Sequence, residues 1–142
     1  VQEYAALLDH VTKNDRALFE DIARFSQKHS QYAELLVDLM IKRSQATTVE
    51  NRINYYYAID SVVKMNKGEF TKLYGKRLCQ VVPEDLKQFG QKGPELKKSF
   101  LILFLTWESC ISLSYLNKML RDYLCLTNDV FLSSHPCLVC RI

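Results

Sequence analysis

The fold of this chain is decided by residues 54–64, which read NYYYAIDSVVK. Nearly every side chain in this stretch is apolar or aromatic, and its one acidic residue is Asp60. At a rotation of about 100° per helical residue, the side chains gather on two stripes. One stripe holds Tyr55, Ile59 and Val63, and the other holds Ile53, Tyr56, Tyr57, Asp60 and Lys64. A helix that is apolar almost all round is normally buried, so we predict a central, buried helix here.

Asp60 is the unusual residue of that helix, because an unpaired buried charge is strongly disfavoured. The residues alone leave two hypotheses open. In the first, Asp60 pairs with Lys64 one turn further on or caps a neighbouring helix. In the second, Asp60 lies at the edge of a groove and accepts a hydrogen bond from a ligand.

The rest of the chain shows further segments with apolar residues at helical spacing. Capping residues, Pro and Gly predict where these helices begin and end. Asn14 is expected to be the N-cap of the second helix, residues 47–50 form a capping box before the central helix, and Pro94 is expected at the first position of a later helix. We expect about eight short helices and no strand, in an all-α fold. The expected segments are 1–12, 18–25, 30–41, the central helix to 66–68, 70–78 with a break near Gly75, 83–90 starting at Pro83, 94–107 and 111–125.

The composition is typical of one soluble globular domain, with 48% hydrophobic and 25% charged residues among 142. With 4 Gly and 3 Pro, the chain has little material for hairpins. No basic and apolar leader stands at the N-terminus, and the longest fully apolar run, 100–105, is too short to cross a bilayer. We expect an intracellular domain at residues 1–126 and a tail of uncertain structure at 127–142.

Charge is concentrated in the middle of the chain. Residues 64–98 carry nine basic and four acidic side chains, a balance of +5, whereas residues 1–63 carry seven basic and nine acidic ones. Such a region attracts anionic partners such as phosphopeptides, nucleic acid or lipid headgroups, although an ordinary solvated surface gives the same bias.

Cysteine and histidine usage predicts neither a disulfide framework nor a metal centre. Three of the five cysteines, Cys79, Cys110 and Cys125, fall in helical patterns and are expected to be reduced core residues. The tail carries one C-x-x-C, at Cys137 and Cys140, beside His135, but no second pair at zinc spacing accompanies it. We therefore expect no cofactor and no metal.

Catalytic motifs are also missing from the sequence. The three histidines lie in different segments, and there is no glycine-rich phosphate loop, no H-E-x-x-H and no paired-carboxylate motif. We predict a binding protein and not an enzyme.

Three stretches of the chain together resemble a known family. They are Y-x-x-L-L-x-x-V-T-x-N-x-R at 4–16, YYAIDSVVK at 56–64 with the apolar positions that follow it to Leu78, and FLTW at 104–107. The chain is similar to the CTD-interacting domain, the helical module that reads the heptad-repeat tail of the largest subunit of RNA polymerase II. Within that family it looks most like the N-terminal module of the large CTD-binding subunit of the pre-mRNA 3′-end cleavage and polyadenylation machinery.

The resemblance implies a right-handed superhelix of eight helices, a nuclear location and a site for a phosphorylated heptad peptide. In the family, an aspartate at the position of Asp60 accepts a hydrogen bond around the tyrosine and turn of that peptide. The other implied peptide-binding residues are Tyr57, Ser61, Lys64, Asn14, Asp15, Arg16 and Ile102. The partners implied are the polymerase heptad repeats and, through the rest of a full-length protein, other 3′-end processing factors; a monomer is the simplest expectation.

One position departs from the pattern of several family members. They place an arginine five residues before the tryptophan, where it holds the phosphate on the serine that follows the tyrosine. Here that residue is Ile102, and Lys97 and Lys98 offer, with Arg16, only a diffuse attraction for phosphate. We therefore predict modest affinity and weak dependence on that phosphate.

Two other functions remain alternatives. The same superhelix occurs in the ENTH and VHS adaptor domains of vesicle traffic, which would bind phosphoinositides or sorting peptides, since fold does not fix function. Weak RNA contact through the basic region 64–98 is compatible with either function.

Overall fold

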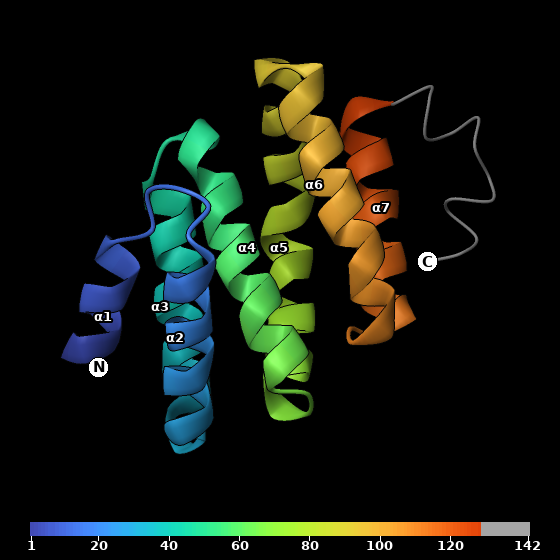
Figure 1. Cartoon of the computed structure of the whole chain (residues 1–142). Helices are drawn as coiled ribbons and strands as arrows, with labels where there is room; N and C mark the ends of the chain where they lie inside the picture. Colours follow the sequence, from blue (N-terminus) through green and yellow to red (C-terminus); the bar gives the residue numbers. More distant parts are fainter. Residues whose placement is uncertain (129–142) are drawn as a thin grey trace. The chain divides into compact units, whose positions relative to one another are not determined.

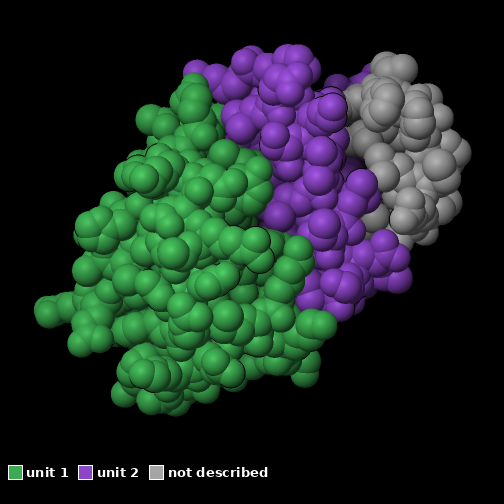
Figure 2. Space-filling model, viewed as in Figure 1, with its two compact units in different colours: residues 1–74 green, residues 75–142 purple. Residues whose placement is uncertain are grey.

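The computed structural model describes residues 1–128, which form seven α-helices and two short 3₁₀ helices and no strand (Figure 1). The expected all-α fold is confirmed. The chain divides into two compact units, Val1–Tyr74 and a second that starts at Gly75 (Figure 2). The elements are α1 Gln2–Asp9, α2 Arg16–Lys28, η1 Ser30–Tyr32, α3 Ala33–Ala46, α4 Val49–Met65, α5 Glu69–Lys92, α6 Pro94–Thr106, η2 Trp107–Ser109 and α7 Leu113–Thr127.

Helix α4 is the buried centre of the first unit, as its sequence predicts. It packs most extensively on α2 and next on α3. The stripe of Tyr55, Ile59 and Val63 is buried, and on the other stripe Tyr56 is 0% exposed. Because α4 is covered on most sides, its few exposed positions are the ones at which it can meet a partner.

Polar side chains attach α4 to backbone carbonyls of its neighbours. The Tyr55 hydroxyl donates to the Leu8 carbonyl at 3.0 Å, and the Asn51 amide donates to the Val11 carbonyl at 2.9 Å. At the C-terminal end of α4, the Asn66 amide donates to the Ala23 carbonyl of α2 at 3.0 Å. These bonds fix the position of α4 against the C-terminal end of α1, the segment that follows it, and α2.

The predicted helix starts are correct to within a few residues. Asp15, not Asn14, caps α2, since its carboxylate accepts from the Leu18 amide at 3.2 Å. Thr48 caps α4 in the same way, one residue after the start of the expected capping box. Ser30 begins a 3₁₀ turn, and α3 starts only at Ala33.

The prediction of two short helices between residues 70 and 90 is wrong, because α5 runs without interruption from Glu69 to Lys92. Gly75 is no break: a Cβ there would lie 2.6 Å from Cδ2 of Tyr115, so the glycine permits close approach of that ring. Pro83 lies inside the helix. The buried residues Val82, Leu86 and Phe89 continue the apolar stripe across it, and their packing outweighs the lost hydrogen bond.

The second unit has an aromatic core around α6. This helix begins at Pro94 as predicted. Trp107 is 0% exposed and packs edge-on against Phe100, with ring centroids 6.0 Å apart, and against Phe104 at 5.8 Å. The tryptophan that ends the third family stretch is therefore a core residue of this unit.

The three cysteines within the described residues form no disulfide, and one of them differs in position from the prediction. Cys79 and Cys110 are half-buried, whereas Cys125 is exposed, so the expected core position is wrong for Cys125. The C-x-x-C tail with His135 lies outside the described residues. In the described part of the chain, no group of side chains could hold a metal ion, and none of its helices has the length and apolarity to cross a membrane.

Candidate peptide-binding site

The central helix presents one incompletely buried stripe. Tyr57, Asp60, Ser61 and Lys64 follow one another at helical spacing on α4; the first three are half-buried and Lys64 is exposed. Their neighbours Tyr56, Ile59 and Val62 are each 0% exposed. The structure thus brings together the four α4 residues that the sequence predicts for the site.

Asp60 and Lys64 form an ion pair at the centre of this stripe. The Lys64 Nζ lies 2.8 Å from Asp60 Oδ1, and the two side chains are 39% and 18% exposed. The contact that the first hypothesis expects, a pair one turn further on, is therefore present. The second hypothesis, a hydrogen bond from a ligand to Asp60, stays a prediction. Pairs of this i,i+4 kind stabilise a helix by only about 0.3–0.5 kcal/mol, so the ammonium can be exchanged for another donor at small cost.

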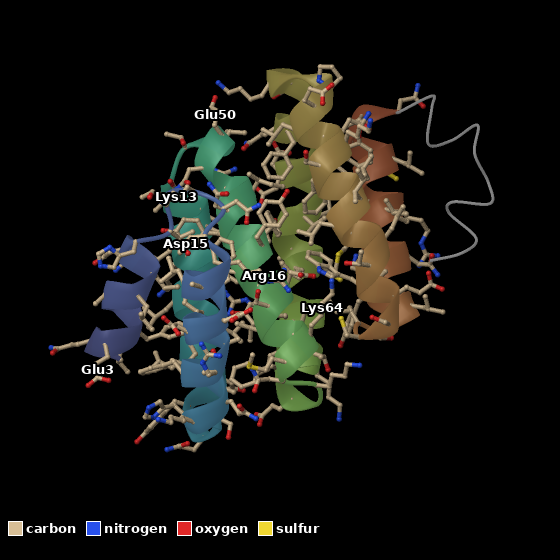
Figure 3. The ribbon with its side chains drawn as sticks, viewed as in Figure 1. Glu3, Lys13, Asp15, Arg16, Glu50 and Lys64 are labelled. Carbon is tan, nitrogen blue, oxygen red and sulfur yellow. The ribbon has the colours of Figure 1, made fainter. Side chains whose placement is uncertain are left out.

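The second group of predicted residues lies at the start of α2, with Asn14 and Asp15 before the helix and Arg16 as its first residue. Figure 3 labels Asp15, Arg16 and, on α4, Lys64. The Asp15 carboxylate is occupied as the α2 cap. The Arg16 side chain is 92% exposed and its Nε lies 3.5 Å from Glu20 Oε1. Asn14 is exposed. Of these three, Arg16 is the residue best able to meet an anion, because its guanidinium faces solvent and a long exposed pair is weak.

Asn54 extends the α4 stripe and is not among the predicted site residues. It lies one turn before Tyr57, is half-buried, and its amide donates to Asn51 Oδ1 at 2.9 Å. The signal that could have identified it is its spacing of three residues from Tyr57. We add it to the candidate site.

The remaining predicted residues lie on α6, in the second unit. Ile102 is 58% exposed, and Lys98, one turn before it, is also exposed. Lys97 points elsewhere, with its Nζ 6.0 Å from the ring centroid of Tyr123 on α7. Lys98 therefore shares a face with Ile102, and Lys97 does not.

A match to a family model shows to which protein family the chain belongs. The model described as the CID domain matches residues 3–115, which include the α4 stripe, the loop before α2 and Ile102. The chain belongs to the CID family.

A solved structure agrees with this assignment. The chain superposes on the crystal structure of the RPR of Pcf11 with a TM-score of 0.70 and 17% identity, covering 84% of this chain and 95% of the other. At that identity the likeness concerns the fold. Among the curated proteins, no sequence matches this chain.

Proposed function

We propose that this CID binds the heptad-repeat tail of the largest subunit of RNA polymerase II. The observation that carries the proposal is the stripe of Tyr57, Asp60, Ser61 and Lys64, because it is the partly exposed face of an otherwise buried helix. It falls within the family match, over residues 3–115. The role is recognition without catalysis.

Asp60 is the proposed acceptor for the peptide. Its carboxylate is 18% exposed, so it is partly desolvated yet reachable. A hydrogen bond to an ionised acceptor contributes on the order of 1.5–3 kcal/mol. When a peptide donor binds, Lys64 gives up part of its contact with Asp60 and becomes available to a phosphate on the peptide.

Phosphate contacts are proposed to be few. Arg16 and Lys98 are exposed and can attract a phosphorylated peptide, while Ile102 provides an apolar contact where several relatives have an arginine. Exposed charges act through solvent and are screened by salt over about 8–10 Å. We propose that the chain binds unmodified and phosphorylated repeats with similar, modest affinity.

In the cell, this recognition would recruit the pre-mRNA 3′-end cleavage and polyadenylation machinery to the polymerase and support transcription termination, in the nucleus. Residues 1–126 would act as one monomeric module. The solved neighbour, the RPR of Pcf11, supports this assignment at the level of fold.

The test is a fluorescence anisotropy titration with two-repeat heptad peptides, unmodified and phosphorylated at each serine in turn, beside a shuffled peptide of the same composition. The proposal expects saturable binding to the heptad peptides and none to the shuffled one. Equal binding to the shuffled peptide would refute it. Co-sedimentation with phosphoinositide vesicles, in place of peptide binding, would favour the vesicle-adaptor function.

A further inference from the structure

We propose that the surface around Tyr32 binds a basic peptide segment of another protein. Tyr32 lines two hollows of the first unit, of about 470 and 550 Å³. Its side chain is 53% exposed, and Leu35, which lines the second hollow, is 42% exposed. We call these two hollows together the Tyr32 surface. None of the proposed heptad-binding residues lines either of them.

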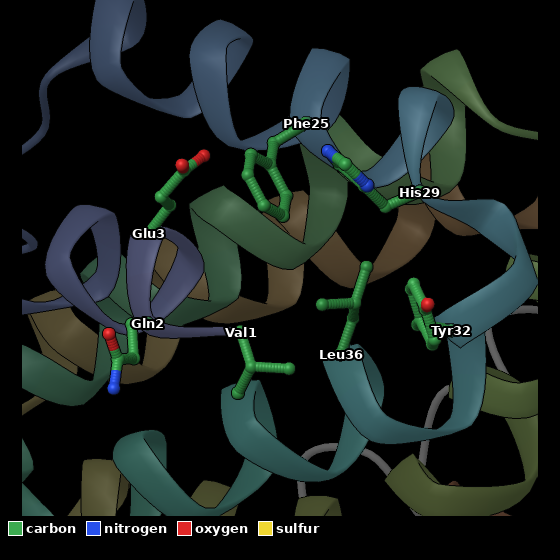
Figure 4. Close-up of a pocket in the computed structure, with 7 residues that line it drawn as sticks. All are labelled: Val1, Gln2, Glu3, Phe25, His29, Tyr32 and Leu36. Atoms are coloured by element: carbon green, nitrogen blue, oxygen red, sulfur yellow. The ribbon is translucent and has the colours of Figure 1, made fainter.

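Aromatic rings form one side of the Tyr32 surface. In the first hollow, the rings of Phe25 and His29 lie with their centroids 4.3 Å apart, and Leu36 and Val1 lie below them (Figure 4). Tyr32 stands beside Leu36 at the same end of this hollow as His29. The faces of phenylalanine and tyrosine rings, here Phe25 and Tyr32, are negative and attract a cation placed over them, and sites that bind ammonium groups are commonly made of such rings.

The charged side chains that line the two hollows have one sign. Glu3 lines the first hollow, with its carboxylate directed toward Phe25 (Figure 4), and Glu34, Asp38 and Glu69 line the second. No lysine or arginine is among the lining residues of either hollow. This acidity contrasts with the chain as a whole, whose formal net charge is +3.

Charge complementarity therefore selects the occupant. Nucleic acid, phosphopeptides and anionic lipid would be repelled by four carboxylates, whereas lysine or arginine would be attracted. An arginine can place its guanidinium over a ring and its aliphatic stem on Leu35 or Leu36. Glu3, Glu34 and Glu69 each stand in the first turn of a helix, which favours a carboxylate there. The helix dipole thus explains why carboxylates occur at these positions, but it explains neither the two hollows nor the exposure of Tyr32.

The experiment measures binding of a fluorescein-labelled probe peptide, GSRLRRLRSG, by anisotropy at low and at physiological salt. Its matched control replaces each arginine by citrulline, which keeps the shape and removes the charge. The protein variants are Tyr32→Ala and the double variant Glu34→Gln/Glu69→Gln. The control variant is Glu84→Gln/Glu108→Gln, which removes the same charge from exposed positions of the second unit.

We expect saturable binding of the probe to the wild-type protein. The citrulline peptide should bind at least about tenfold more weakly, and each variant of the Tyr32 surface should bind the probe at least about fivefold more weakly. The control variant should bind the probe to within about twofold of wild type. Thermal melting checks that all variants are folded, and the substitution sites Tyr32, Glu34 and Glu69 are exposed. The proposal is overturned by absence of binding up to about 1 mM probe. It is overturned equally if Tyr32→Ala binds as wild type does, or if the control variant loses as much affinity as the double variant.

Discussion

Replacing Ile102 by arginine should strengthen the binding of a phosphorylated heptad peptide. Ile102 stands five residues before Trp107, the position at which the family resemblance places a phosphate-binding arginine. Its side chain is 58% exposed, so the substitution removes little buried apolar surface. The free energy of unfolding should change by no more than about 0.5 kcal/mol, as at most surface positions.

The size of the gain follows from two opposing contributions. A charge-assisted hydrogen bond from a guanidinium to a phosphate contributes about 1.5–3 kcal/mol. Fixing a long side chain on binding costs about 0.5–1.5 kcal/mol. The mid-points of these two ranges leave a net gain of about 1.25 kcal/mol, or about an 8-fold lower Kd.

The assay is anisotropy with a two-repeat heptad peptide, either unmodified or phosphorylated on the serine that follows the tyrosine. The matched control is Leu113→Arg, which adds the same charge at another exposed apolar position of the second unit, 48% exposed. Ile102→Arg should bind the phosphorylated peptide about 8-fold more tightly than wild type, by the net gain above. The unmodified peptide should gain no affinity, because it carries no phosphate and loses the apolar contact proposed for Ile102.

Two results would show that this reasoning is wrong. If Leu113→Arg raises the affinity for the phosphorylated peptide as much as Ile102→Arg does, general attraction explains the gain. If Ile102→Arg leaves both affinities unchanged, residue 102 does not meet the phosphate.

Two further predictions concern stability. Gly75→Ala should lower the free energy of unfolding by about 1–3 kcal/mol, because the new Cβ would lie 2.6 Å from the Tyr115 ring. Gly90→Ala, where the nearest atom is an ordinary 3.6 Å away, should instead raise it by about 0.5–1 kcal/mol; equal urea midpoints for the two variants would contradict this. Burial raises the pKa of Tyr4 to about 12, so the unfolded chain loses that proton first as the pH rises. Between pH of about 10 and about 12, stability should fall by up to about 1.4 kcal/mol per pH unit for this group, and Tyr4→Phe should make the measured loss shallower by that amount; an unchanged slope in urea denaturation would count against it.

Much of the fold could be predicted from the sequence because local signals and tertiary packing agree. The stretch around Ile59 is apolar on most sides and is buried in the structure, and Pro94 and Asn66 mark helix ends as their chemistry predicts. Where packing outweighs local preference, the prediction was wrong. Gly75 and Pro83 read as breaks, but the buried stripe that continues past both keeps α5 whole.

The candidate site was predictable to a similar degree. Helical periodicity places Tyr57, Asp60 and Lys64 on one stripe, and their partial exposure on α4 agrees with it. The binding role of these residues and of Ser61 comes from the family resemblance and stays a prediction. Periodicity could not show that Lys97 is directed to Tyr123, since that contact joins α6 to α7 across residues far apart in the sequence. Nor could it reveal the hollows beside Tyr32, which α1, α2, α3 and α5 line together.

The most direct test of the central claim compares two substitutions that break equivalent ion pairs. Asp60→Asn removes the pair with Lys64 at 2.8 Å, and Asp122→Asn removes the pair with Lys118 at 2.9 Å, both of i,i+4 spacing. Each should lower the free energy of unfolding by only about 0.5 kcal/mol. Binding of the unmodified two-repeat heptad peptide should weaken by at least about tenfold, or about 1.4 kcal/mol, in Asp60→Asn, and should stay at the wild-type value in Asp122→Asn. If both variants bind the peptide as wild type does, the stripe of α4 is not where the chain recognises the polymerase tail.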